Sequence, residues 1–225
     1  MKYSVVIPAY NAENTISEAV NSVLRQFVAP EEIIVVDDGS TDNTVRIVEN
    51  LEGPIKLLKQ TNSGPGHATT TGIKQVTTKT IATLDSDDLW LPHKMERQLE
   101  ELCINQELSG VFSRIKTFRN LDDPNDPGQV SDGWLRTTMV IRTEVALFNG
   151  DIIDPAGGAG EMIDWLARIR ESGNVLKQLP EVLALRRIRE GSLSYNKTSA
   201  RDSGYLNVAR AAILRRREAE KLKNG

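Results

Sequence analysis

Three carboxylates lie within four residues in the segment Asp85-Ser86-Asp87-Asp88, which directly follows the apolar run 81–84. Like charges so close together are costly unless a cation or hydrogen-bond donors compensate them. Carboxylate oxygens suit Mg²⁺ or Mn²⁺, ions that keep several waters and bridge to the phosphates of a substrate. A solvated turn that caps the following helix is the alternative, and the motif by itself does not decide between the two.

Three further apolar runs end in residues suited to gripping a nucleotide diphosphate. Tyr10 could stack on a base, although a core tyrosine is the alternative. Asp38 could accept a hydrogen bond from a base N–H or a ribose hydroxyl, while the residues after it could simply cap the next helix. Gly64 and Gly66 either let the backbone approach a phosphate or sugar or form a plain turn. The three run ends are Pro8-Ala9-Tyr10-Asn11, Asp37-Asp38-Gly39-Ser40 and Gly64-Pro65-Gly66.

Two more carboxylates, Glu161 and Asp164, open a predicted helix and share one of its faces because they are three residues apart. Acidic residues in a first turn can be present only because the helix dipole favours them. If they point into a cleft, one of them could act as a general base. Trp165 is then a core residue or a platform for an acceptor.

The elements that must position these residues alternate between strands and helices over the first 84 residues. This alternation predicts a parallel sheet with right-handed crossovers, and in such sheets ligands bind beyond the carboxyl ends of the strands. All four run ends are therefore expected at one edge. The predicted strands are 4–7, 32–36, 55–58 and 81–84; the predicted helices are 16–27, with Asn11 or Asn14 as N-cap, 45–51 and one ending near Val76.

After residue 90 the pattern changes, but no linker divides the chain, so we expect one domain. The polar, Pro/Gly-rich stretch 120–133 is predicted to be a loop. The remaining predictions are helices at 91–102, 161–171 and 205–223, strands at 111–118 and 138–142, and a strand or extended arm at 182–188.

Composition describes an ordinary globular protein, with 39% hydrophobic and 26% charged residues among 225. No stretch approaches the roughly 20 apolar residues of a membrane-spanning helix, and no signal-peptide pattern precedes the first strand. Cys103, the single cysteine, cannot form an internal disulfide and is expected to be buried in an apolar helical pattern. A cytoplasmic location is the expectation that follows.

The net charge of −3 hides an asymmetry, because residues 197–225 carry eight Lys/Arg against three acids. That tail has a charge of +5, so the rest of the chain has −8. An acidic body argues against a nucleic-acid-binding surface. The tail helix could pack on the body, pair two subunits as a homodimer, or make a peripheral membrane contact; its small apolar face favours the first two.

Taken together, these segments resemble the inverting glycosyltransferase family 2, which has the GT-A fold. The resemblance is dense over residues 4–90, looser from about 138 to 194, and does not cover the tail. It implies a nucleotide-sugar-binding half (1–90), an acceptor half (91–196) and a basic helical tail (197–225). The motifs that carry it are SVVIPAYNAENTI, EIIVVDDGSTDNT, QTNSGPG, TGI, IATLDSDDLWLP and GEMIDWLARI.

The resemblance implies a role for each matching position in binding a nucleotide-sugar donor, and a UDP-sugar is the expected one. Asp38 would meet N3–H of the base, Asp85 the ribose, and Asp87 a Mn²⁺ or Mg²⁺ that bridges the diphosphate. A carboxylate would deprotonate the acceptor hydroxyl while the sugar is displaced in line with inversion. No motif specifies the acceptor. The other donor-binding positions would be Pro8, Ala9, Tyr10, Asn11, Gly64, Pro65 and Ser86.

Three departures from the family pattern affect these assignments. Thr69 and Thr70 stand where many relatives have an Arg-Asn pair, so one cation near the diphosphate is missing. Met162 stands where many relatives have the basic Asp, which leaves Glu161 as our first choice of base and Asp164 as the second. Arg189 replaces a His that often precedes the final Gly-Ser; arginine cannot ligate a metal but can bind phosphate.

Two other functions compete with glycosyl transfer. A protein that keeps donor binding but has lost turnover is consistent with the changes at Met162 and Arg189. A sugar-nucleotide pyrophosphorylase shares a Rossmann-like sheet, but such enzymes begin with a Gly-rich loop that contains Arg and Lys. The segment 8–12 has none of these basic residues, which counts against that activity.

Overall fold

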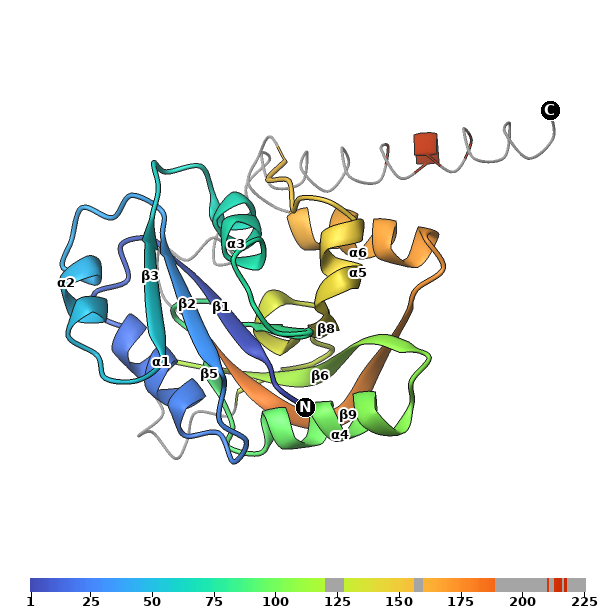
Figure 1. Cartoon of the computed structure of the whole chain (residues 1–225), viewed down its shortest axis with the longest axis horizontal. Helices are drawn as coiled ribbons and strands as arrows, with labels where there is room; N and C mark the ends of the chain where they lie inside the picture. Colours follow the sequence, from blue (N-terminus) through green and yellow to red (C-terminus); the bar gives the residue numbers. More distant parts are fainter. Residues whose placement is uncertain (120–127, 156–159, 189–209, 211–212, 216, 218–225) are drawn as a thin grey trace.

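The computed structural model describes residues 1–119, 128–155, 160–188, 210, 213–215 and 217 (Figure 1). In these residues one mixed sheet has the strand order β3-β2-β1-β4-β8-β6-β9-β5, with β7 paired to β6. The strands are β1 (Ser4–Ala9), β2 (Glu32–Asp37), β3 (Ile55–Lys59), β4 (Thr80–Thr83), β5 (Leu89–Trp90), β6 (Leu108–Phe118), β7 (Val130–Ser131), β8 (Val140–Arg142) and β9 (Val175–Arg187).

Helices cover both faces of this sheet. They are α1 (Ile16–Leu24), α2 (Thr44–Glu49), α3 (Pro65–Ile73), α4 (Lys94–Ile104), α5 (Thr143–Phe148) and α6 (Glu161–Glu171), with a 3₁₀ turn, η1, at Arg136–Thr138. Figure 1 shows α1 and α2 on one side of strands β1 to β3, and α3 on the other. Strands covered on both faces can be apolar at successive positions, which explains the buried runs in β1 and β2.

The parallel half of the sheet confirms the predicted edge. Strand β1 pairs in parallel with β2 and β4, and β2 with β3, so the carboxyl ends of all four strands lie at the same edge. Alternate side chains of β1 serve opposite faces, since Val5 and Ile7 join the cluster under α1 while Val6 joins the one under α3. Helix α3 lies so close that a Cβ on Gly72 would be 2.3 Å from Val6 Cγ1.

The second half of the sheet is mixed. Strand β8 runs antiparallel to β4 and β6, whereas β6 and β9 run parallel to each other. Helix α6 coincides with the predicted span, but other boundaries differ. Residues 89–90 pair with β9 as β5, which delays helix α4 to Lys94, and the predicted strand at 138 begins as the turn η1. Residues 120–127 of the predicted loop lie outside the described residues, and its described part contains β7; helix α5 has no counterpart among the predicted elements.

Three local predictions in the first half are wrong. Helix α1 ends at Leu24, and Phe27 lies beyond it with 62% of its surface exposed and its ring against His93. Thr15, not Asn11 or Asn14, precedes α1, and it makes no side-chain cap. Cys103 is exposed rather than buried, because the buried stripe of α4 ends on Leu102, one position earlier on the helix.

The predicted terminal helix lies mostly outside the described residues. Residues 210, 213–215 and 217 are helical. None of the helices in the described part of the chain is long and apolar enough to cross a membrane.

Lys94, the first residue of α4, is fully buried. Its Nζ lies 4.0 Å from the centre of the Trp90 ring and 3.8 Å from Met95 Sδ. These groups compensate a positive charge poorly, so burial holds the pKa of Lys94 well below its usual value.

We therefore expect Lys94→Met to raise the free energy of unfolding by about 1–3 kcal/mol at pH 7, because methionine needs no polar partner. The folded-state pKa is below the unfolded one, so wild-type stability rises as the pH approaches the unfolded value of about 10.4. The advantage of the variant should shrink accordingly. Urea unfolding at pH 7 and pH 9.5 measures both effects; a variant less stable than the wild type at both pH values contradicts the interpretation.

Candidate functional site

The loop from Asp85 to Asp88, between β4 and β5, directs its three carboxylates to different partners. Asp88 is buried and accepts hydrogen bonds from Thr137 Oγ1 at 2.6 Å and from the Arg187 backbone N–H at 2.9 Å. Burial, together with the charges of Asp85 and Asp87, raises the pKa of Asp88 to about 8. Asp88 thus fastens this loop to η1 and β9, and each of its two oxygens accepts a hydrogen bond from the protein.

Arg136 joins Asp85 to Glu161 across the site. Its Nε donates to Asp85 Oδ1 at 2.7 Å, and its Nη1 donates to Glu161 Oε1 at 2.9 Å. The arginine side chain is only 9% exposed. Burial by itself lowers the pKa of Arg136, but the charges of Asp85, Glu161 and Asp154 raise it above its usual value. A fixed positive charge therefore lies between a strand-end carboxylate and the first residue of α6.

The sequence reasoning missed Arg136. A signal was present, because Arg136 is the single charged residue in the stretch 133–141, between Asp132 and Arg142. An isolated arginine among apolar residues is rarely buried without a partner.

Arg187 holds the same loop from the opposite side. Its Nε donates to the Asp87 backbone oxygen at 3.0 Å, and its guanidinium pairs with Glu18 of α1. The guanidinium also lies 4.6 Å from the centre of the Phe118 ring. Strand β9, helix α1 and the loop are thereby locked together, with Asp87 and Ser86 partly exposed between them.

Asp38, at the end of β2, organises the loop that follows β3. Its buried carboxylate accepts hydrogen bonds from Gln60 Nε2 at 2.7 Å and from the backbone N–H groups of Ser63 and Gly64 at 2.9 Å each. A carboxylate has about four acceptor positions, so three protein donors leave room for about one more. One hydrogen bond to a base remains compatible with this arrangement.

The end of β1 lies beside the end of β2. Pro8 and Ala9 are buried in β1, and the Ala9 carbonyl accepts a hydrogen bond from Asp38 N–H at 2.8 Å. Asn11 adopts a left-handed conformation, with φ of 47°, and its Oδ1 accepts from Thr41 N–H at 2.8 Å. Tyr10, the residue directly after β1, is 50% exposed, which excludes the core alternative.

The two glycines of the Gly64-Pro65-Gly66 turn face a protein carboxylate. Asp154 accepts hydrogen bonds from the backbone N–H groups of Gly66 and His67, each at 2.9 Å. A Cβ on Gly64 or Gly66 would lie 2.7 Å or 2.9 Å from the Asp154 oxygens. Because glycine has no side chain, the Asp154 carboxylate can approach this turn closely. Asp154 is not among the residues that the sequence predicts for the site.

The two candidate bases on α6 have different surroundings. Glu161 contacts Arg136 and through it Asp85. Asp164 is held by Arg168 Nε at 3.0 Å and by Arg215 Nη1 at 2.8 Å, so each of its oxygens has an ion pair elsewhere. Met162 is buried in the core. The structure thus brings Glu161, and not Asp164, to the strand-end carboxylates.

The two remaining departures from the family pattern are at Thr69 and Arg189. Thr69 is buried and donates to the Pro65 carbonyl within its own helix at 2.6 Å, so it replaces the missing arginine with no group that could bind phosphate. Arg189 lies outside the described residues.

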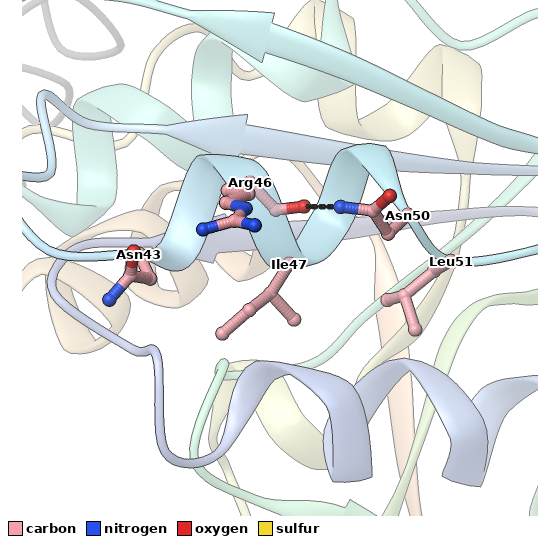
Figure 2. Close-up of a pocket in the computed structure, with 5 residues that line it drawn as sticks. All are labelled: Asn43, Arg46, Ile47, Asn50 and Leu51. Atoms are coloured by element: carbon pink, nitrogen blue, oxygen red, sulfur yellow. Dashed lines mark hydrogen bonds between the residues drawn. The ribbon is translucent and has the colours of Figure 1, made fainter.

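Two hollows of the described surface lie away from these residues. A depression of about 440 Å³ on α2 is lined by Asn43, Arg46, Ile47, Asn50 and Leu51, and Figure 2 shows the Asn50 amide bonded to the Arg46 carbonyl. A second, of about 500 Å³, lies around residues 102–109 and Arg142. Neither contains a strand-end carboxylate, so the candidate site is defined by the edge of the sheet.

Comparison with known proteins agrees with this geometry. A family model described as glycosyl transferase family 2 matches residues 4–155. An uncharacterized glycosyltransferase of Nostoc sp. is 43% identical over 130 residues, which cover 56% of this chain and 39% of that protein. The Escherichia coli UDP-Glc:alpha-D-GlcNAc-diphosphoundecaprenol beta-1,3-glucosyltransferase WfgD is 37% identical over 119 residues, 52% of this chain and 47% of that protein.

Among solved structures, S. aureus TarS (residues 1–349) in complex with UDP-GlcNAc superposes with a TM-score of 0.76 and 25% identity, over 95% of this chain and 66% of that one. The fold is therefore the GT-A fold, with a parallel donor-side sheet completed by mixed strands. The chain belongs to glycosyl transferase family 2. It spans less than half the length of the two curated relatives described above.

Proposed function

We propose that this chain is an inverting glycosyltransferase that moves a sugar from a UDP-sugar to an acceptor hydroxyl. The observation that carries the proposal is the pair of ion contacts through Arg136, which connect Asp85 at the donor edge to Glu161 on α6. The printed names of two similar proteins, a UDP-glucose-dependent transferase and TarS with UDP-GlcNAc, support a uridine donor.

The donor assignments follow the edge of the sheet. Tyr10 is exposed beside the end of β2, where its ring can stack on uracil, and Asp38 has an acceptor position for N3–H of the base. Asp85 is partly exposed and is oriented by Arg136, which suits a contact to ribose hydroxyls. In this arrangement the nucleoside lies along β1, β2 and β4.

A divalent metal fits this donor set if the substrate completes its coordination. The resemblance to the family motif assigns the metal to Asp87, while Asp88 contacts Thr137 and Arg187, and Asp85 contacts Arg136. No group of three acidic, His or Cys residues within the described chain forms a closed cage. Mg²⁺ needs only one or two protein carboxylates when phosphates and waters supply the rest, and Mn²⁺ accepts similar oxygen ligands. When bound, the metal would neutralise charge on the leaving diphosphate.

The proposed reaction is a single displacement at the anomeric carbon. Glu161 accepts the proton of the acceptor hydroxyl as that oxygen bonds to the sugar, and the bond to the diphosphate breaks on the opposite side. Arg136 fixes the Glu161 carboxylate so that it does not have to be oriented during the reaction. The described residues thus supply base, base orientation and donor contacts.

A second candidate is donor binding without turnover. One observation favours it: Met162, which stands where many relatives have the basic Asp, is buried and cannot take a proton. Glu161 would then be solely a partner of Arg136. Turnover by the purified protein separates the two functions.

The division into a donor half (1–90), an acceptor half (91–196) and a basic tail remains a proposal. Arg215 of the tail pairs with Asp164 and Glu171 of α6, which supports packing of the tail on the body. A homodimer or a contact with an anionic membrane surface through the same helix are the other roles that we consider.

The proposed activity can be measured without the acceptor, as slow release of UDP from UDP-sugars in the presence of Mn²⁺. We expect EDTA to abolish release, and Asp87→Ala to reduce it about 100-fold, because a positioned charge opposite the diphosphate is lost. Asp132→Ala, whose carboxylate is exposed and lies 3.9 Å from Arg114, is the matched control. Tight binding of UDP without release by the wild type would establish the donor-binding function instead.

A further inference from the structure

A short segment, residues 149–154, lies between the donor-side helix α3 and the helix that carries Glu161. From α6, Trp165 Nε1 donates to the Gly150 carbonyl at 2.9 Å and Arg168 Nη2 to the Asp151 carbonyl at 2.6 Å. From α3, Thr70 Oγ1 accepts a hydrogen bond from Ile152 N–H at 2.9 Å. We call residues 149–154 the bridging segment; it touches both helices, which lie on the same face of the sheet (Figure 1).

Asp154 ends the bridging segment with its carboxylate on the first turn of α3. It accepts the N–H groups of Gly66 and His67, which have no partner inside the helix. Gly64, the N-cap residue, makes no side-chain cap of its own. The negative charge also interacts favourably with the N-terminal end of the helix dipole. A residue of the acceptor half thus caps a helix of the donor half.

Asp38 holds the same loop from the donor side. It accepts hydrogen bonds from the N–H groups of Ser63 and Gly64, which Pro65 separates from the two residues that Asp154 holds. Consecutive stretches of one loop are therefore fixed by two carboxylates, one beside the proposed uracil position and one seven residues before Glu161. Both carboxylates hold backbone N–H groups of this loop.

We propose that Asp154 is a positioning residue that sets the location of α6, and with it Glu161, against the nucleotide-binding loop. Gly64 and Gly66 are part of the same contact, because they leave the space that the Asp154 carboxylate occupies. Gly66 lies in the first turn of α3, where alanine is the better helix former. Its lack of a side chain is explained by Asp154, because a Cβ there would lie 2.9 Å from both carboxylate oxygens. The catalytic role of Glu161 rests on the proposed function. The role of Asp154 in placing α6 is independent of that function.

Asp154→Ala is expected to lower UDP release about 10–100-fold while the affinity for UDP changes less than threefold, because misplacement affects the reacting groups more than the bound nucleoside. Asp151→Ala is the matched control. Its carboxylate is in the same segment and pairs with Lys74, but both side chains are about half exposed, so little change is expected.

The Gly66→Ala variant tests the same contact from the side of helix α3, because its Cβ would collide with the Asp154 carboxylate. It should reduce release by a factor similar to that of Asp154→Ala, and the double variant should be no worse than either single variant, because both remove one contact. Effects that multiply, or a Gly66→Ala variant with wild-type turnover, would overturn the proposal.

Hydrogen exchange gives a readout that needs no activity. Amides of Gly66, His67 and the first turn of α6 should exchange faster in Asp154→Ala and in Gly66→Ala than in the wild type and in Asp151→Ala. Unchanged exchange in α6 sinks the positioning role even if turnover falls. A wild type that releases no UDP sinks only the transfer proposal, since exchange still decides whether Asp154 places α6.

Discussion

Arg136→Met is expected to lower UDP release about 1000-fold and to reduce the free energy of unfolding by about 2–4 kcal/mol. The guanidinium separates two carboxylates, and its loss leaves Asp85 and Glu161 facing each other while they are 30% and 15% exposed. Donor orientation and base orientation are lost together. Enzymatic release and urea unfolding, measured on the same preparation, follow the two effects.

Arg136→Lys separates geometry from charge. Lysine keeps the positive charge but cannot donate to both carboxylates as the planar guanidinium does, so stability should recover more than turnover. Arg170→Met is a suitable control, because Arg170 lies 4.4 Å over the Trp134 ring and contacts neither carboxylate. Wild-type turnover in Arg136→Met would show that the contacts through Arg136 are not part of the reaction.

Glu161→Gln is expected to lower release about 100- to 10,000-fold with little loss of stability, since the amide oxygen can still accept from Arg136 but cannot take a proton. Asp164→Asn should keep release within a few-fold of the wild type. It should instead weaken the contacts with Arg168 and Arg215 and make the tail easier to cleave by limited proteolysis. The opposite pattern, with Asp164→Asn inactive and Glu161→Gln active, would reverse our choice of base.

The buried Asp88 illustrates what local sequence conceals. By residue type and spacing, the three carboxylates of the 85–88 segment are equivalent, and each can bind a cation or cap a turn; the family resemblance assigned roles to Asp85 and Asp87 but none to Asp88. Their difference comes from Thr137 and the Arg187 backbone, which approach Asp88 from segments 49 and 99 residues away. A hydrogen bond to a distant element depends on the path of the chain, which no local pattern encodes.

Other misses have similar causes. The apolar spacing places Phe27 and Cys103 on buried helix faces. Phe27 is exposed because α1 ends before it, and Cys103 is exposed because it lies on α4 beside the buried stripe. Asp154 was not noticed because its function depends on two glycines almost 90 residues earlier, which looked like a ligand-binding turn. The sequence left these glycines open between close approach of a phosphate or sugar and a plain turn, and the group that lies against them in the structure is the Asp154 carboxylate.

The sequence by itself determined the family, the parallel first half of the sheet and the common edge at which its four strands end. These follow from apolar runs, helix periodicity and motif spacing, which are local and repeat at fixed intervals. Only the tertiary structure decided how the carboxylates divide their partners: Asp88 turns inward, Asp164 pairs with Arg168 and the tail, and Arg136 connects Asp85 to Glu161. Charge pairing and hydrogen bonding act over a few ångströms in space, and these partners lie as far as 99 residues apart in the chain.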